Sequence, residues 1–232
     1  MNVMSFNTQH CLNYITREID FDIMAKAIVD CGADIVGLNE MRGSGEDAEY
    51  TDQVGMLSKL TDMKYSFFAP AISFPNKGPY GNGFLSKIPI VKAENILIPD
   101  PPLEGRRKGY YETRCVLKVE LEGGYTVLVS HFGLNPDEQE SAVRTVMEHL
   151  ADEKCILMGD FNVEPDDSLL APIRERMVDT AESFDSPKFS IPSDAPDRKI
   201  DYVFVSKDMK VQCADIPAIV ASDHRPYTAV VE

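Results

Sequence analysis

The sequence predicts a mixed α/β (α+β) fold in which two packed sheets carry helices on their outer faces. Predicted strands outnumber predicted helices, and the helices are interspersed between strands along the chain. Such elements bury their apolar faces when sheets pack together and helices cover them. No Ser/Gly-rich linker or charge run divides the 232 residues, and single domains reach about 250 residues. We therefore expect one domain over residues 1–232.

The first half of the chain is predicted to hold two helices among short strands. Apolar residues recur at helical spacing between Asp20 and Cys31, and Gly32 ends that helix. The apolar run that follows it is typical of a buried strand, and Pro and Gly residues separate the later strands. The predicted helices are 20–31 and 51–61, and the predicted strands are 1–6, 33–38, 65–69, 83–86 and 91–98.

The second half begins with a predicted β-hairpin. Alternating apolar residues over 114–122 and 125–131 flank the pair Gly123-Gly124, which is typical of a tight hairpin turn. A long amphipathic helix is expected next, because apolar residues recur on one face of it. The predicted helices are 137–152 and 168–177, and the later predicted strands are 155–160, 199–206, 210–216 and 227–231.

The composition limits the kind of partner that the protein can bind. Asp and Glu number 38 against 23 Lys and Arg, which gives a formal net charge of −15, and 44% of the residues are hydrophobic. The hydrophobic share is typical of a globular protein. A protein that holds nucleic acid mainly by charge needs clustered Lys and Arg. The acidity therefore disfavours a long polyanionic partner, and a phosphate group needs a locally positive feature to bind.

The sequence also predicts a cytoplasmic protein without disulfides. The N-terminus has no basic segment followed by an apolar one, and no apolar run approaches the roughly 18 residues that span a bilayer. The five cysteines form no CxxC pair and are odd in number. We therefore expect reduced thiols rather than a disulfide framework or a zinc site.

Polar side chains recur at the ends of the predicted strands. If these ends lie on one rim of the sheets, they bring carboxylates, amides and imidazoles to one place. Oxygen-rich ligands of this kind suit Mg²⁺ or Mn²⁺ rather than zinc, and a bound divalent cation is the positive feature that the net charge calls for. The residues concerned are Asn7, Glu40, His131, Asp160, Asn162, Asp201, Asp223 and His224.

Each of these residues also has an ordinary structural explanation. A Glu such as Glu40 after a strand is usually a solvated loop residue, and a lone histidine such as His131 is usually satisfied in the core or on the surface. Asp160 and Asn162 fit an Asx-turn, and Asp223-His224 fits a turn before a proline. The functional interpretation gains weight because the same strand-end placement occurs six times.

These residues stand in motifs that resemble the endonuclease/exonuclease/phosphatase superfamily, in its order and spacing. The resemblance runs from about Asn2 to the C-terminus, and the combination of GDFN, IDY and SDHRP is specific. It implies a four-layer α/β/β/α sandwich, a bound Mg²⁺ or Mn²⁺ and hydrolysis of a phosphate ester. The motifs are MSFNTQH, IVGLNE, GNGFLS, LVSHFGL, GDFN, IDY and SDHRP, together with Arg114 and His10, which resemble residues of bacterial members.

The resemblance and the demands of phosphate hydrolysis imply a role for each residue. A catalyst must neutralise charge, align water and stabilise the leaving oxygen. Glu40, Asn7 and Asp223 are expected to hold the metal. His224 is expected to be the base for the attacking water, oriented by Asp201, with Asp160 in the same role. Asn162 and His131 are expected to bind the phosphate or leaving group, and Asn82, Arg114 and His10 are expected to contact substrate.

The leading hypothesis is a monomeric, metal-dependent phosphodiesterase or phosphatase that acts on a small-molecule or lipid-headgroup phosphoester. A DNA endonuclease or abasic-site repair enzyme is disfavoured by the charge and the short loops. A catalytically inactive binding domain is disfavoured because it has no chemical need for the polar strand ends. The basic cluster Arg106-Arg107-Lys108 is either a solvated loop or a lid over an anionic group.

Overall fold

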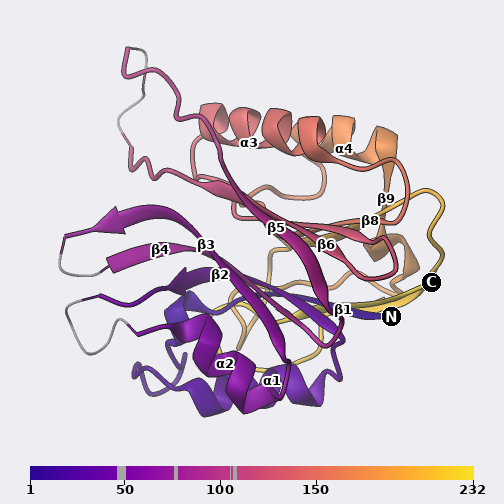
Figure 1. Cartoon of the computed structure of the whole chain (residues 1–232). Helices are drawn as coiled ribbons and strands as arrows, with labels where there is room; N and C mark the ends of the chain where they lie inside the picture. The colour runs from indigo at the N-terminus through magenta and orange to yellow at the C-terminus, as the bar shows by residue number, and fades with distance from the viewer. Residues whose placement is uncertain (46–50, 76–77, 105, 107–108) are drawn as a thin grey trace.

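The computed structural model describes residues 1–45, 51–75, 78–104, 106 and 109–232. Over these residues the chain forms two six-stranded sheets that pack face to face, with helices on both outer faces (Figure 1). This arrangement confirms the predicted four-layer sandwich. Within the same residues, no helix combines the length and the apolar character needed to cross a membrane.

The first sheet has the strand order β11-β12-β1-β2-β4-β3. Helices α1 (Phe21–Asp30) and α2 (Gln53–Thr61) cover its outer face (Figure 1). Asp20 caps α1, because its carboxylate accepts the backbone N–H of Ile23. The strands are β1 (Asn2–Asn7), β2 (Ile35–Arg42), β3 (Tyr65–Phe74), β4 (Gly78–Ser86), β11 (Val211–Asp215) and β12 (Tyr227–Val231).

The second sheet has the strand order β5-β6-β7-β8-β10-β9. Its outer face is covered by α3 (Pro136–His149) and α4 (Ala171–Arg176) (Figure 1). Its strands are β5 (Ile90–Leu97), β6 (Cys115–Leu121), β7 (Thr126–Ser130), β8 (Cys155–Asp160), β9 (Met177–Asp179) and β10 (Asp201–Ser206). Three short 3-10 segments complete the chain: η1 (Gln9–Cys11), η2 (Ser168–Leu170) and η3 (Thr180–Ser183).

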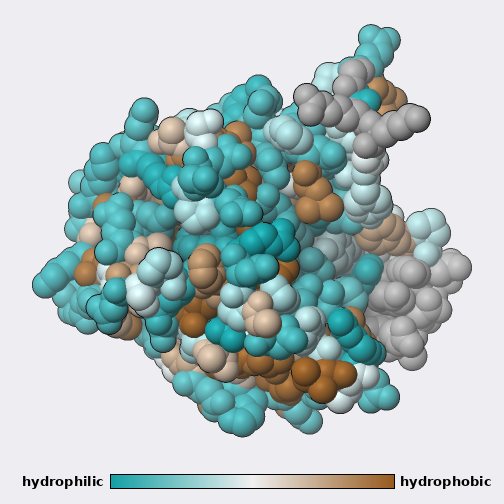
Figure 2. All heavy atoms as spheres, turned by 180° about the vertical axis from the view of Figure 1, so that it is seen from behind, coloured by the Kyte–Doolittle hydropathy of each residue, from teal (hydrophilic) through white to brown (hydrophobic). Residues whose placement is uncertain are grey.

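Three apolar clusters fill the spaces between the four layers. One lies between the sheets and contains Phe84, Val129 and Tyr227, and the other two lie between each sheet and its helices. The sheets approach closely at Gly37, where an added Cβ would lie 2.6 Å from Sδ of Met158. The molecular face seen in Figure 2 is predominantly hydrophilic, with hydrophobic residues in small groups.

The structure extends the predicted strand 65–69 and divides the predicted helix 168–177. Strand β3 continues through Pro70 to Phe74, beyond the predicted end at Ala69. Pro70 is tolerated because β3 lies at the edge of its sheet and the register shifts beside it. The predicted helix 168–177 divides into η2 and α4, and its last residue, Met177, begins the short strand β9.

The strand directions bring the ends of several strands to one edge. Strands β1 and β2 run parallel, as do β7 and β8, so both pairs end together. Strand β10 runs antiparallel to β8 with Asp201 opposite Asp160, so β10 begins where β8 ends. Strand β12 likewise begins beside the end of β1. The rim that the sequence predicted therefore exists, with contributions from both sheets.

Candidate active site

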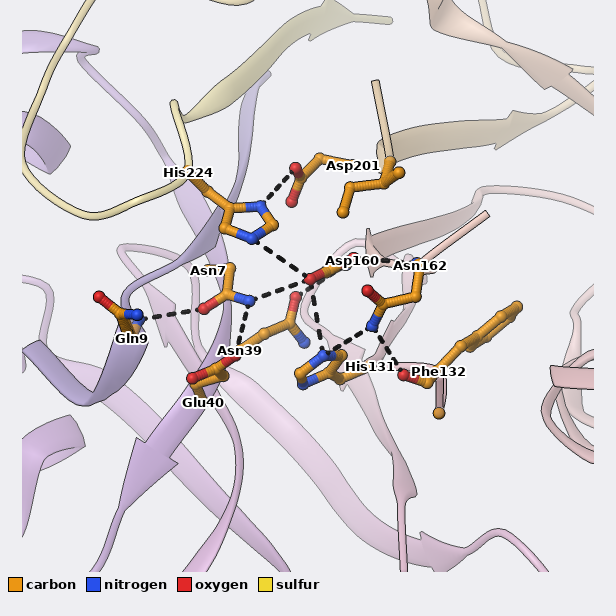
Figure 3. A network of polar contacts seen from close by, with 12 residues as sticks. Asn7, Gln9, Asn39, Glu40, His131, Phe132, Asp160, Asn162, Asp201 and His224 are labelled. Atoms are coloured by element: carbon orange, nitrogen blue, oxygen red, sulfur yellow. Dashed lines mark hydrogen bonds and ion pairs between the residues drawn. The ribbon is translucent and has the colours of Figure 1, made fainter. Parts of the chain in front are cut away.

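Polar side chains from both sheets converge on the carboxylate of Asp160 at the end of β8 (Figure 3). Nδ2 of Asn7 donates to Oδ2 of Asp160 at 3.0 Å. Nε2 of His131 and Nε2 of His224 lie 3.5 and 3.6 Å from the same oxygen. Asp160 is 2% exposed. The structure thus brings together residues that lie far apart in the sequence. Asn7 and His224 are separated by 217 positions.

The backbone of Asp160 is fixed by a neighbouring amide. Oδ1 of Asn39 accepts the backbone N–H of Asp160 at 2.9 Å, and Nδ2 of Asn39 donates to Oδ1 of Asn82 at 2.8 Å. Asn82 in turn donates to the carbonyl of Cys115 at 2.9 Å. These buried contacts tie the two sheets together, so the structure gives Asn82 a place in the framework behind the site. Its contact with substrate stays a prediction.

His224 is held between two carboxylates. Its Nδ1 lies 2.8 Å from Oδ2 of Asp201, and both side chains are almost fully buried. Burial by itself lowers the pKa of His224, but the carboxylates of Asp201 and Asp160 outweigh burial and raise that pKa to about 10. Burial raises the pKa of Asp160 to about 7, with Asp201 acting in the same direction. The protonation states of Asp160 and His224 therefore depend on each other.

Glu40 stands at an irregularity in β2 rather than at its end. The register between β2 and β4 shifts between Leu38 and Met41, and Glu40 adopts a left-handed φ of 61°. A non-glycine residue in this region is strained by about 1–2 kcal/mol. The bulge re-aims the Glu40 side chain toward the rim, where Nδ2 of Asn7 donates to its Oε1 at 3.1 Å.

His10 lies on the same side of the site, in η1. Its Nδ1 is 3.8 Å from Oε2 of Glu40, an ion-pair distance, and its own φ is 48°. Burial alone would raise the pKa of Glu40, but His10 and Asn7 help to hold that pKa well below its usual range. Glu40 is therefore a carboxylate over the whole physiological range. His10 also lines a cavity of about 340 Å³ with Arg17 and Gln53.

His131 and Asn162 form the opposite side of the site. Nδ2 of Asn162 donates to the carbonyl of Phe132 at 3.0 Å and lies 3.2 Å from Nε2 of His131. The backbone N–H of Asn162 donates to Oδ1 of Asp160 at 2.9 Å. Nη1 of Arg114 lies 3.0 Å from Nδ1 of His131. Arg114 is thus brought to the site through His131.

The donor set at the Glu40 end fits a hard divalent cation. Glu40 is ionised, and burial followed by the nearby charge of Glu40 raises the pKa of Asp223. Two carboxylates that repel each other in a buried rim are stabilised by a cation between them, and oxygen ligands suit Mg²⁺ or Mn²⁺. Asn7 donates to Glu40 through Nδ2, so in this arrangement its Oδ1, which accepts the N–H of Gln9, is turned away from Glu40.

Asp160, Asp201 and His224 form a further buried cluster in which one ligand atom of each lies within 4.8 Å of the others. Because His224 and Asp201 are already joined at 2.8 Å, we interpret this cluster as a hydrogen-bonded chain rather than as the primary cation site.

Two residues at the site were not predicted from the sequence. Asn39 is not among the predicted site residues, although its position one residue before Glu40 in an apolar strand marks it as buried. Glu112, whose Oε1 is 2.8 Å from Nη1 of Arg114, lies in a loop without periodicity, so no local pattern singles it out. Arg106 of the basic cluster donates to the carbonyl of Pro101. The other two residues of that cluster, for which the sequence left a solvated loop and a lid open, lie outside the described residues.

The sequence profile of the Endonuclease/Exonuclease/phosphatase family matches residues 4–224. The chain belongs to this family. Among curated proteins, none matches the chain by sequence. The family match spans every residue of the rim from Asn7 to His224, so the site described above is the part of the fold that the family profile covers.

Solved structures with the same fold include proteins named for this family, a mannosyl-6-phosphatase and a nocturnin catalytic domain. An endonuclease/exonuclease/phosphatase from Beutenbergia cavernae is 21% identical, with a TM-score of 0.77 over 100% of this chain and 71% of that chain. A mannosyl-6-phosphatase from Bacteroides thetaiotaomicron is 16% identical, with a TM-score of 0.75 over 100% and 99%. The human nocturnin catalytic domain is 18% identical, with a TM-score of 0.69 over 100% and 94%. At these identities the likeness shows the shared fold.

Proposed function

We propose that this protein is a Mg²⁺- or Mn²⁺-dependent hydrolase of phosphate esters on a small molecule or a lipid headgroup. The observation that carries the proposal is the convergence of Asn7, His131 and His224 on the buried carboxylate of Asp160. A binding domain without chemistry gains nothing from burying the carboxylates of Asp160 and Asp201 with two imidazoles at one rim, because each buried charge costs free energy. The family membership and the phosphatase among its structural neighbours support the same class of reaction.

The residues divide the reaction between the two sides of the site. Glu40 and Asp223, with Asn7 beside them, would hold the cation, which supplies charge neutralisation at the phosphoryl oxygens. On the His224 side, Asp160 and His224 would orient the attacking water, with Asp201 fixing the ring through Nδ1. Because the raised pKa of His224 keeps its ring charged at neutral pH, Asp160, with a pKa of about 7, would take the proton.

The phosphate would meet its hydrogen-bond donors on the opposite side. Asn162 offers its amide nitrogen Nδ2, and His131 offers its ring nitrogen Nε2. These two atoms lie 3.2 Å apart. Donors placed where negative charge develops stabilise the transition state, and removing one typically costs about 2.7–4 kcal/mol. We therefore expect His131→Ala to lower kcat by about 10²–10³-fold.

The charge of the chain favours a short substrate over a long one. With a net charge of −15, most of the surface repels a polyanion, while the acidic residues of the rim are assigned to the cation and to proton transfer. A single phosphoester needs contacts only with the residues of the rim. A DNA or RNA strand needs cationic contacts along several phosphates.

A substrate panel tests this proposal. The purified protein is assayed with Mg²⁺, Mn²⁺ or EDTA against p-nitrophenyl phosphate, bis-p-nitrophenyl phosphate, sphingomyelin, inositol phosphates, RNA, and supercoiled and abasic DNA. We expect metal-dependent turnover of small or lipid phosphoesters. Cleavage of plasmid at catalytic amounts of enzyme would replace the proposal with a nuclease function. No metal-dependent turnover of any substrate would favour a binding domain.

A further inference from the structure

The side chain of Arg114 lies between Glu112 and His131. Its Nη1 is 2.8 Å from Oε1 of Glu112 and 3.0 Å from Nδ1 of His131. The Arg114 side chain is 11% exposed, and those of Glu112 and His131 are 8% and 6% exposed. The contact with Glu112 is an ion pair, since Oε1 of Glu112 accepts no hydrogen bond within the described part of the chain, so the hydrogens of Nη1 remain available to Nδ1 of His131.

Glu112 is itself fixed by two further contacts. The hydroxyl of Tyr110 donates to its Oε2 at 2.8 Å, and its backbone N–H donates to Oε1 of Glu138 at 3.1 Å. Glu138 belongs to the capping box at the start of α3. The segment that carries Glu112 and Arg114 is therefore held against a helix. Arg114 in turn pairs with a carboxylate that accepts a further hydrogen bond from Tyr110.

The contact with Arg114 decides which protonation state His131 can adopt. A guanidinium donates hydrogen bonds and accepts none. A doubly protonated imidazolium, or a neutral ring with its proton on Nδ1, would place an N–H against the N–H of Arg114 at 3.0 Å. Only the neutral ring with its proton on Nε2 accepts at Nδ1. Burial first, and then the charge of Arg114, also lower the pKa of His131 well below its usual range.

The contacts at Nε2 of His131 point in two directions. Nδ2 of Asn162 donates one hydrogen to the carbonyl of Phe132 at 3.0 Å, and its second hydrogen could reach Nε2 of His131 at 3.2 Å only if that nitrogen carried no proton. The permanently charged guanidinium of Arg114 is the stronger donor of the two, so it determines which ring nitrogen accepts. The Nε2–H then faces Oδ2 of Asp160 at 3.5 Å. A phosphoryl or leaving oxygen that enters the site beside Asp160 would meet this N–H.

We propose that Arg114 is a positioning residue that keeps His131 neutral with its proton on Nε2, and that Glu112 holds Arg114 for this purpose. His131 then acts on the phosphate as a hydrogen-bond donor and not as an imidazolium. This inference rests on the proposed function for the identity of the group that receives the hydrogen bond. It replaces direct substrate contact as the main role of Arg114.

The protonation state is tested directly by ¹⁵N NMR of the histidine rings in the metal-free protein without substrate. The chain has 4 histidines, and a His131→Gln spectrum assigns the relevant signals. The two ring nitrogens of a neutral tautomer have well separated shifts, so the proton can be placed. We expect the Nε2–H form of His131 to persist between about pH 5 and pH 8, where an ordinary histidine titrates.

Three variants test the roles of Arg114 and Glu112. In Arg114→Ala we expect His131 to show a mixture of tautomers and to titrate, with kcat lowered by about 10–100-fold and KM little changed. Arg114→Lys, which keeps a cationic donor, should restore part of the Nε2–H population of His131. Glu112→Gln, which removes the ion pair with Arg114, should lower that population. The matched control is Arg144→Ala on α3, whose side chain donates to Oγ of Ser141 and should leave the His131 signals unchanged.

Two results would overturn the inference. One is a wild-type His131 that carries its proton on Nδ1 or titrates as an ordinary imidazole. The other is an Arg114→Ala variant with unchanged ring signals and a raised KM, which would make Arg114 a direct phosphate ligand. The wild-type spectrum needs no variant to fold. It is also independent of turnover, so an inactive protein with the Nε2–H tautomer would contradict the proposed function alone.

Discussion

Nδ1 of His224 lies 2.8 Å from Oδ2 of Asp201, while Nε2 of the same ring faces Oδ2 of Asp160 at 3.6 Å. Asp201 therefore determines both the orientation of the ring and which nitrogen is left for the reaction. Such a carboxylate partner fixes the orientation of an imidazole and stabilises the positive charge on its ring.

Replacing Asp201 with asparagine should remove the carboxylate that fixes the ring of His224, while the side chain keeps nearly the same size. We expect Asp201→Asn to lower kcat by about 10²–10⁴-fold, the contribution typical of a general base. Steady-state kinetics on the best substrate of the panel measures the effect. The control is Asp197→Asn, since Asp197 is exposed and pairs with its neighbour Arg198. A variant at position 201 with near wild-type kcat would remove His224 from the reaction.

Glu40 should dominate the affinity for the cation. We expect Glu40→Gln to weaken Mn²⁺ binding by at least about tenfold, because the amide keeps the size of the carboxylate but loses its charge. Isothermal titration calorimetry with Mn²⁺ measures this without any substrate. Glu94→Gln on the exposed strand β5 is the control, since Glu94 pairs with Lys92 far from the rim. Equal affinities in the two variants would place the cation elsewhere.

Gly159 should tolerate no side chain. It has a φ of 145°, and a Cβ there would lie 1.8 Å from the backbone oxygen of Ser130. We expect Gly159→Ala to lower the free energy of unfolding by at least about 2 kcal/mol, because β7 and β8 must separate to make room. The control is Gly124→Ala at φ 82°, where nothing lies within 4 Å and only backbone strain of about 1 kcal/mol applies. Urea denaturation compares the two, and equal losses would contradict the close approach.

Lys199 is a buried cation that should cost stability at neutral pH. It is 5% exposed, its Nζ finds no hydrogen-bond acceptor among the described residues, and it lies 3.4 Å from the ring of Tyr202. Burial lowers the pKa of Lys199 from 10.5 to about 8. Below about pH 8 the amine is charged in both states and the folded state bears the penalty. As the pH rises from 8 toward 10.5, the folded state binds fewer protons than the unfolded state and the penalty disappears.

We therefore expect Lys199→Met to raise the free energy of unfolding at pH 7. A pKa lowered from 10.5 to about 8 corresponds to about 3 kcal/mol at most, and the lost contact with the ring of Tyr202 offsets part of that gain. The gain should shrink between pH 8 and pH 10. Urea denaturation at several pH values measures it, with the exposed Lys210→Met as control. A destabilised variant at pH 7 would show that the aromatic contact outweighs burial.

The sequence predicted most of the architecture because its strands and helices have clear periodicity. The hairpin at Gly123-Gly124 and the capped helix after Asp20 are confirmed. The continuation of β3 through Pro70 could not be predicted, because whether a proline ends a strand depends on whether that strand lies at a sheet edge. That is a property of the whole sheet.

The site was predictable where its residues share the strand-end pattern. Asn7, Glu40, Asp160 and His224 follow this pattern and meet in the structure. The bulge that gives Glu40 its positive φ, and the chain that links His131 through Arg114 to Glu112, depend on contacts between segments far apart in sequence. No local pattern carries that information.

The most direct test is the hydrolysis of p-nitrophenyl phosphate and bis-p-nitrophenyl phosphate by wild-type protein and by Glu40→Gln, each with EDTA and then with excess Mg²⁺ or Mn²⁺. We expect EDTA to abolish wild-type turnover of at least one of the two esters, the cation to restore it, and Glu40→Gln to stay inactive at the same cation concentration. Turnover that persists in EDTA, or an equally active Glu40→Gln, would contradict a metal-dependent phosphoesterase centred on this rim.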